Sequence, residues 1–452
     1  MRLLVRSILL RNYLGCIEGS FYVEYRLSAD SELEVRKASI NIIADITRLT
    51  PVKLKWELVG IFNALYKDKE LKKPSLMQLG KFICSLEGTE IPNFLLELYT
   101  SLADSKITID EELKCNCAAT FPKVFGIVGM KEWKIFKPMF KNLVKKKNLQ
   151  VKENVMMSIH KIAQVMGTQM AVEMLDPLVR KYLSNKNRVN ICLLNLHEFL
   201  KVLNEPLRKN YLEIVQGILN KSGFDWRKRE VVASHIGDYI KLFNPQTVYE
   251  SIFPMTCGLI QDIVMKVRKK SCAQYIEIIR HFNNESEYLK GAFSFVFKLS
   301  ESVNYKERQS FLFICESFVS EPLLFQKQLL TYFLYIQKDK VMNVRVTLAK
   351  VLMTFMSSSV ELAGNIYLLK LAELLKEDSA KEVREVMEKK VTQSLTDEEL
   401  KEKQEELEKV QKMAAESLEQ ATGDEELEEE TKRRETATLL KKTIKVDEID
   451  KS

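Results

Sequence analysis

The sequence has few residues that interrupt helices and few patterns that indicate strands. Glycine and proline together number 25 of 452 residues, and runs that alternate apolar with polar residues are scarce, which argues against a β-rich fold. Because no run of 18 apolar residues occurs, we expect no membrane-spanning helix. The first residues, MRLLVRSILLRNYLG, carry arginines where a signal peptide has its apolar core, so we expect no secretory leader and a cytoplasmic protein, with the nucleus as a second location.

The common motifs of enzymes and cofactor sites are also missing. Neither a glycine-rich phosphate loop nor HExxH nor GxSxG occurs. The eight cysteines are scattered, which indicates a reducing compartment and buried thiols, and Cys115 and Cys117 lack further ligands at metal-site spacing. The four histidines fall inside helical patterns in different parts of the chain, and we interpret them as packing or surface residues: His160, His197, His235 and His281. The sequence therefore predicts no enzyme, no cofactor and no metal site.

What the chain does contain is a repeated pattern of an Asp, four residues, and then Val-Arg. The valines of its copies are separated by 232, 77 and 39 residues, which correspond to six steps, two steps and one step of about 39 residues. The four copies are Asp30/Val35/Arg36, Asp262/Val267/Arg268, Asp339/Val344/Arg345 and Asp378/Val383/Arg384. A motif that recurs in phase predicts a repeat architecture, which presents long binding surfaces rather than a catalytic pocket.

Stepping through the chain at this period places ten repeats, each read as a pair of helices. Lys or Arg occupies the second place of the Val-Arg motif in eight of the ten positions. In each repeat we expect a first helix, a short turn with the Asp, and a second helix of about four turns starting near the Val-Arg. The fold is therefore predicted to be all-α, an α-solenoid of about ten antiparallel helix pairs with a charged C-terminal tail.

The second helix of the seventh repeat shows the apolar face that such stacking requires. Its sequence, VMKVRKKSCAQYIEIIRHF, places apolar residues over a face wide enough to contact neighbours on two sides. The residues of this face are Val267, Cys272, Tyr275, Ile276, Ile279 and Phe282.

The Asp and the Arg of the pattern are interpreted mainly as architectural. The Asp can cap the second helix or accept from its first turn. The Arg is expected to reach the Asp of the next repeat across roughly 10 Å. The result is a ladder of exposed charge pairs, each contributing about 0–1 kcal/mol.

Charge divides the chain into a basic body and an acidic end. Residues 397–452 carry 19 acidic and 11 basic side chains, a net charge of −8, so the total of +7 leaves +15 for residues 1–396. We predict a solenoid over residues 1–395, a charged helix over 396–420 and a disordered tail over 421–452. An acidic arm that shields the basic body or binds a partner is the functional alternative.

One dense basic cluster lies near the fourth repeat. Its members are Lys131, Lys134, Lys137, Lys141, Lys145, Lys146, Lys147 and Lys152. The interleaved Trp133, Phe136 and Phe140 are spaced as core residues. Since no nucleic-acid module accompanies the cluster, we read it as a solvated face or as a surface for an acidic protein, and nucleic-acid binding stays a minor alternative.

Several segments resemble HEAT-repeat subunits of the protein phosphatase 2A family. FDWRKREVVASHIGDYIKLFNPQTVYESIFPMTCGLIQDIVMKVRKKS (224–271) is similar to a repeat pair of its scaffold subunit. KDKVMNVRVTLAKVLMTF (338–355) resembles more closely the regulatory subunit 1 family of protein phosphatase 4. RQSFLFICESFVSEPLLFQKQLL (308–330) and CAATFPKVFGIVG (117–129) are also similar. The resemblance covers roughly residues 85–390 in repeat register, but the chain has fewer repeats than the 2A scaffold and its acidic end has no counterpart there.

This resemblance implies a non-catalytic subunit that binds a serine/threonine phosphatase catalytic subunit through the turns between paired helices. A further regulatory or substrate protein is a second expected partner, whereas a membrane is not expected. Trp226, an indole at a polar turn, and the arginines beside it have the character of interface anchors. The matching positions are Asp225, Trp226, Arg227, Arg229, Asp262, Arg268, Asn343 and Arg345. A general HEAT-repeat adaptor in transport or complex assembly, unrelated to phosphatases, remains the alternative.

Overall fold

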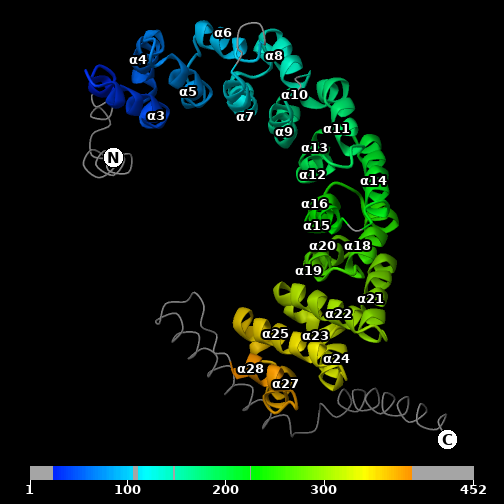
Figure 1. Ribbon diagram of the computed structural model, residues 1–452. Helices are drawn as coiled ribbons and strands as arrows, with labels where there is room; N and C mark the ends of the chain where they lie inside the picture. The colour runs from blue at the N-terminus through cyan, green and yellow to red at the C-terminus, as the bar shows by residue number, and fades with distance from the viewer. Residues whose placement is uncertain (1–23, 105–109, 146–147, 224, 389–452) are drawn as a thin grey trace, which may run out of the picture. The chain divides into compact units, whose positions relative to one another are not determined.

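The computed structural model describes residues 24–104, 110–145, 148–223 and 225–388 (Figure 1). Secondary structure within these residues is helical, without a strand, and the predicted all-α class is confirmed. The chain was predicted to form one solenoid body over residues 1–395; its internal contacts divide it into two compact units, Met1–Phe243 and Asn244–Ser452. The predicted charged helix 396–420 and tail 421–452 lie outside the described residues.

In the first unit, the helices alternate in the predicted order between the first and second positions of a pair. The helices at first positions are α4 (Lys55–Lys67), α6 (Asn93–Ser101), α8 (Trp133–Lys145), α11 (Asp176–Leu183) and α14 (Glu205–Asn220). Those at second positions are α3 (Leu33–Leu49), α5 (Lys72–Ser85), α7 (Glu111–Val128), α9 (Leu149–Met157), α10 (Ile159–Met174), α12 (Val189–Leu193), α13 (Leu196–Val202), α15 (Trp226–Ser234) and α16 (Ile236–Ile240). Gly167, with φ 73°, breaks α10, and the residues after it begin the next pair.

The second unit continues the same alternation. First positions are held by α17 (Pro245–Thr247), the π-helix Val248–Ile252, α18 (Phe253–Ile260), α21 (Ser286–Ser300), α23 (Pro322–Gln328), α24 (Leu330–Tyr335), α26 (Val360–Ala363) and α27 (Ile366–Lys376). Second positions are held by α19 (Met265–Ala273), α20 (Tyr275–His281), α22 (Tyr305–Ser317), α25 (Met342–Ser358) and α28 (Lys381–Glu388).

Within each unit, second helices pack against the second helices of neighbouring repeats. In the first unit α3 packs on α5, α5 on α7 and α7 on α9, and in the second unit α19 packs on α22, α22 on α25 and α25 on α28. Figure 1 shows these helices following one another as a row in each unit, beside a row of first helices. Helix pairs stacked in this way form an α-solenoid, and the predicted fold is confirmed.

Some second helices are interrupted where the sequence predicts a continuous helix. The predicted four-turn helix of the seventh repeat divides at Gln274 into α19 and α20. His235, with φ −116° and ψ 13°, separates α15 from α16 in the same way. Each interruption involves a single residue, and apolar residues are buried on both sides of it.

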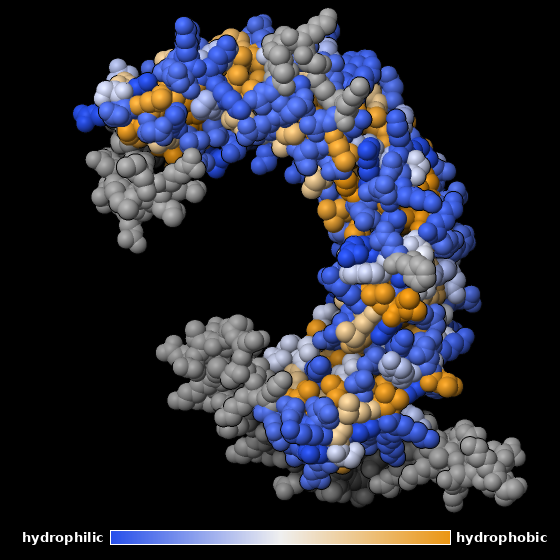
Figure 2. Space-filling model, in the orientation of Figure 1, coloured by the Kyte–Doolittle hydropathy of each residue, from blue (hydrophilic) through white to orange (hydrophobic). Residues whose placement is uncertain are grey.

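The core lies between the helix rows, as the pattern predicts. All six residues of the apolar face in the seventh repeat are buried, including Val267, Cys272 and Tyr275 at 0% exposure. In the first unit Trp133, Phe136 and Phe140 are buried among other aromatic rings, which confirms that they are core residues. The surface is mostly hydrophilic with hydrophobic patches between (Figure 2). Among the described helices, none has the length and apolar character that crossing a membrane requires.

Candidate partner-binding turns

The aspartates of the repeated pattern hold the turn that leads into the second helix. In each of the four copies, the Asp Oδ1 accepts a hydrogen bond of 2.8 Å from the backbone N–H two residues later. The second helices begin three residues after the Asp in all four copies, at Leu33, Met265, Met342 and Lys381. The expected capping role is therefore confirmed in a modified form, because the Asp closes the turn before the helix rather than occupying the N-cap position.

The arginine six residues after each Asp fastens the same turn from the other side. Arg345 Nη1 donates to the carbonyl oxygen of Asp339 at 2.7 Å, and Arg268 and Arg384 make the same bond to Asp262 and Asp378. Arg36 likewise donates to the Asp30 carbonyl at 2.8 Å. Each Arg thus ties its helix to the preceding turn, whatever its outer nitrogens contact.

In the second unit, those outer nitrogens form the predicted ladder to the next repeat. Arg308 Nε and Nη2 lie 2.5 and 2.9 Å from the two carboxylate oxygens of Asp339. Arg345 makes the same bidentate pair with Asp378 at 2.7 and 3.0 Å. Hydrogen bonding to these carboxylates raises the pKa of both guanidinium groups. The ladder is confirmed. Its carboxylates are only 3% and 8% exposed and its arginines 16% and 13%, so these pairs are largely buried, whereas exposed pairs were expected.

The first unit has a looser form of the ladder. Arg36 reaches Asp68 with a single contact of 3.3 Å, and the two side chains are 22% and 30% exposed. Lys73 pairs with Asp110 at 2.7 Å. These pairs match the exposed rungs that the sequence predicted.

The predicted anchor Trp226 is the first residue of α15, and it is half-buried rather than exposed. The guanidinium of Arg227, which is exposed, lies 5.0 Å from the centre of the Trp226 ring. Asp225 pairs with Lys228 at 3.0 Å. Arg229 donates to the carbonyl of Gly223 at 2.6 Å and holds the turn. The stacked Trp226–Arg227 pair is therefore the part of this turn that a partner can contact.

The remaining predicted residues lie in the second unit and differ in accessibility. Asn343 is exposed, while its backbone carbonyl accepts from Gln309 Nε2 at 3.1 Å. Arg345 is held by Asp378, and Arg268 is buried at 3% exposure. Their roles in partner binding stay predictions. The structure assigns most of these arginines a first role in holding their own turns.

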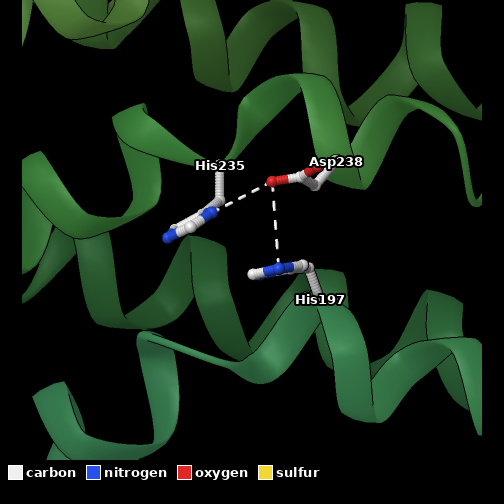
Figure 3. A group of neighbouring side chains, drawn as sticks. All are labelled: His197, His235 and Asp238. Atoms are coloured by element: carbon white, nitrogen blue, oxygen red, sulfur yellow. Dashed lines mark hydrogen bonds and ion pairs between the residues drawn. The ribbon is translucent and has the colours of Figure 1, made fainter. Parts of the chain in front are cut away.

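Two histidines that sequence reasoning treated separately lie together in the first unit (Figure 3). The rings of His197 and His235 are stacked, with centroids 4.3 Å apart. Asp238 Oδ2 lies 3.0 Å from His235 Nδ1 and 3.8 Å from His197 Nε2. Burial, and then the neighbouring charge of His235, lower the pKa of His197.

This group could hold a metal ion, since one ligand atom from each of the three residues lies within 4.8 Å of the others. The signal for it was present in the sequence. His160, His197 and His235 are separated by 37 and 38 residues, which is about one repeat, so they occupy neighbouring places in successive second helices.

Part of the basic cluster is exposed on α8. Lys134, Lys141 and Lys145 are exposed, opposite the buried aromatic residues of the same helix. Lys131, just before α8, is also exposed, whereas Lys137 and Lys152 are half-buried. Lys146 and Lys147 lie outside the described residues. This arrangement agrees with the solvated face that the sequence predicts.

Comparison with known proteins supports the resemblance seen in the motifs. Residues 117–218 match the family model of the middle domain of protein phosphatase 4 regulatory subunit 1, and this region begins with the segment 117–129. Serine/threonine-protein phosphatase 4 regulatory subunit 1 of Homo sapiens is 28% identical over 360 residues, which cover 75% of this chain and 37% of that protein. The Mus musculus protein is 28% identical over 274 residues, covering 58% of this chain and 29% of its own length.

Solved structures show the fold alone. The match to the crystal structure of Kap121p covers 85% of this chain and 46% of the Kap121p chain, with a TM-score of 0.50 and 11% sequence identity. Kap121p bound to Pho4p gives a TM-score of 0.52 at 11% identity. The chain spans well under half the length of the curated relatives that it matches. The family-model match and the 28% identity over 75% of this chain show that most of the chain is similar to regulatory subunit 1 of protein phosphatase 4. The resemblance inferred from its motifs is confirmed.

Proposed function

We propose that this chain is a non-catalytic regulatory or scaffold subunit that binds the catalytic subunit of a serine/threonine phosphatase of the 2A/4 type. The observation that carries the proposal is the similarity, over 75% of the chain, to proteins named as regulatory subunits of protein phosphatase 4. The stack of helix pairs agrees with it, because such stacks present turns in series to a partner.

In this proposal the catalytic subunit contacts the turns between first and second helices in repeats six to nine, from Asp225 in the sixth repeat to Arg345 in the ninth. The stacked Trp226–Arg227 pair is its best-supported element. A half-buried indole under an exposed guanidinium combines apolar area with a charge, which is typical of interface anchors. Asn343 offers a second exposed polar contact, whereas Arg229 and Arg345 shape the turns that present these residues.

A binding experiment with the purified full chain and the protein phosphatase 4 catalytic subunit tests this function. Trp226→Ala should weaken binding by about 2 kcal/mol, roughly thirtyfold. Arg227→Glu should weaken it further if the partner surface is acidic. Lys145→Glu is the matched charge-reversal control, on an exposed face of α8, and should leave binding unchanged. Circular dichroism of each variant checks that the helices are retained.

The outcome also decides between this proposal and the general adaptor. If the wild-type chain fails to bind the catalytic subunit at micromolar concentration, the phosphatase function is wrong. If it binds and only the Lys145 variant loses binding, the interface lies at the basic cluster instead. A cytoplasmic location, with the nucleus as second compartment, and a further regulatory or substrate protein as partner belong to the same proposal. Fluorescent tagging and affinity purification test them.

A further inference from the structure

The ladder of the second unit lacks one rung. Asp339 stands six residues before Arg345, and it pairs with Arg308 of the preceding repeat. The residue six positions before Arg308 is Ser302. The position of the next repeat that would supply the acidic partner of Arg268 is therefore a serine, whereas the corresponding position for Arg308 is Asp339.

Ser302 keeps one function of the missing aspartate and loses the other. Its Oγ accepts from the backbone N–H of Asn304 at 3.1 Å, as Asp339 Oδ1 accepts from that of Val341 at 2.8 Å. The turn is therefore closed in the same manner. A hydroxyl carries no charge and is shorter than a carboxylate, so it does not supply the acceptor pair that an arginine needs.

Arg268 is buried and forms no ion pair among the described residues. The residue is 3% exposed, and its Nη1 makes the usual bonds to the carbonyls of Asp262 and Ile263 at 3.0 and 3.2 Å. Its Nε is buried and has no hydrogen-bond partner, and no carboxylate in the described part of the chain forms an ion pair with it. Burial lowers the pKa of this guanidinium, and the nearby charge of Asp262 offsets that effect only in part.

A pocket opens beside this arginine, between α19, α22 and α25. It has a volume of about 590 Å³, and Arg268, Lys269, Lys306 and Lys350 contribute four positive charges to its lining against the single acidic residue Glu316. The lining also includes apolar side chains: Ile263, Met265, Phe313, Val346 and Val351. Ile263 and Met265 are 71% and 52% exposed, so apolar surface is offered next to the positive charge.

We propose that this pocket binds an acidic segment of a partner protein. An Asp or Glu of that segment supplies the missing rung, its two oxygens accepting from Arg268 as those of Asp339 accept from Arg308. The lysines attract the segment, and an apolar neighbour of the acid packs on Met265 and Phe313. This site goes beyond the proposed phosphatase binding, because it takes an acidic segment in a pocket of the second unit. Its lining shares Arg268 and Asn343 with the positions predicted to contact the catalytic subunit, but it does not include the Trp226–Arg227 pair.

The chemistry favours a peptide carboxylate over a free anion. In the two intact rungs, the same arginine position holds a carboxylate in bidentate geometry. Part of the pocket wall is apolar; a small hydrated anion leaves this surface unused, but an adjacent side chain of a peptide covers it.

The experiment uses the full chain and a short fluorescein-labelled peptide with Leu-Glu-Asp-Leu at its centre, flanked by Gly and Ser. Fluorescence anisotropy at low ionic strength should show saturable binding. The matched peptide with Gln and Asn in place of the two acids should bind at least about tenfold more weakly, since charge-assisted hydrogen bonds are lost. Equal binding of both peptides would overturn the proposal.

The decisive variants alter the missing rung itself. Ser302→Asp supplies the carboxylate from within the chain and should weaken peptide binding at least about tenfold. Asn has the shape of Asp without its charge, so the peptide affinity of Ser302→Asn should stay within about twofold of the wild type. Arg268→Gln should weaken binding as Ser302→Asp does. Wild-type affinity in either charged-site variant would overturn the proposal, even if the other variant were misfolded.

Two further outcomes identify a different occupant. If the peptide binds only after residues 397–452 are removed, the acidic end of this chain fills the pocket and a partner segment does not. If inorganic phosphate at millimolar concentration competes as well as the peptide does, the site is a simple anion site. Phosphatase binding through Trp226 is measured separately, so its failure does not affect this result.

Discussion

The buried rungs should contribute far more to stability than the exposed ones, and Asp339→Asn tests this. The substitution leaves an oxygen for the N–H of Val341 but removes the charge and one of the two acceptors of Arg308. Because Asp339 is 3% exposed and Arg308 16% exposed, Arg308 remains largely buried without its partner. Breaking a buried pair in this way costs about 3–5 kcal/mol. We expect about 3 kcal/mol, since part of the guanidinium reaches solvent.

Asp68→Asn provides the matched control at the same place in the second repeat. There the pair has one contact of 3.3 Å, and both side chains are partly exposed, so the expected loss is about 0–1 kcal/mol. Urea unfolding of a long repeat array is not reliably two-state, and local amide hydrogen exchange is the better assay.

In that assay, amides of α22 and α25 should lose about a hundredfold of their protection in Asp339→Asn, the equivalent of about 3 kcal/mol. Amides of α3 and α5 should change by less than about fivefold in Asp68→Asn. If the two variants lose equal protection, burial does not set the strength of the rungs and the reasoning is wrong. A double-mutant cycle with Arg308→Gln then isolates the pair from the separate bonds of Arg308 to its own turn.

Two further predictions concern the first unit. Burial lowers the pKa of His160 and of His197, so the unfolded chain takes up protons before the folded chain as pH falls below about 6.5. The melting temperature should therefore fall between pH 7 and pH 5, and His197→Gln should make that fall shallower. An unchanged slope in His197→Gln would show that His197 does not cause the pH dependence. Gly80→Ala should lower the melting temperature, because the new Cβ would press into the side chain of Thr120. Gly60→Ala, where no neighbouring atom lies within 4 Å of the new Cβ, should instead raise the free energy of unfolding by about 1 kcal/mol, since alanine favours the helix. Equal effects of the two changes would show that α5 and α7 can move apart.

The repeat could be predicted from the sequence because one physical requirement recurs at one spacing. Each turn needs an acceptor for the N–H two residues later and a donor for its own carbonyl, and Asp with Arg six positions on meets both needs. The apolar face of the seventh repeat could be predicted for the same reason, since every second helix must contact neighbours on two sides. These features are local or periodic, and a single chain displays them.

The features that the sequence did not predict depend on how successive repeats align. The interruptions occur at His235 and Gln274, which are neither proline nor glycine, so no helix-breaking residue marks them in the sequence. The contact between His197 and His235 becomes visible only when their spacing of 38 residues is compared with the repeat. Burial of the Arg308–Asp339 pair likewise depends on how far α22 and α25 cover it.

The missing rung shows why a recurrent motif is a poor guide to a binding residue in this chain. Arg268 and Arg345 occupy the same place in their repeats and carry the same charge. Asp378 holds the outer nitrogens of Arg345, whereas no carboxylate of the described residues pairs with Arg268. The difference lies in the following repeat, where Ser302 replaces an aspartate and preserves the turn. An unpaired buried cation destabilises the free chain. A partner carboxylate that pairs with Arg268 would therefore contribute the same kind of stabilisation that Asp378 already provides to Arg345. The positions that can bind an acidic partner are therefore those where the architectural pattern fails while the turn is maintained.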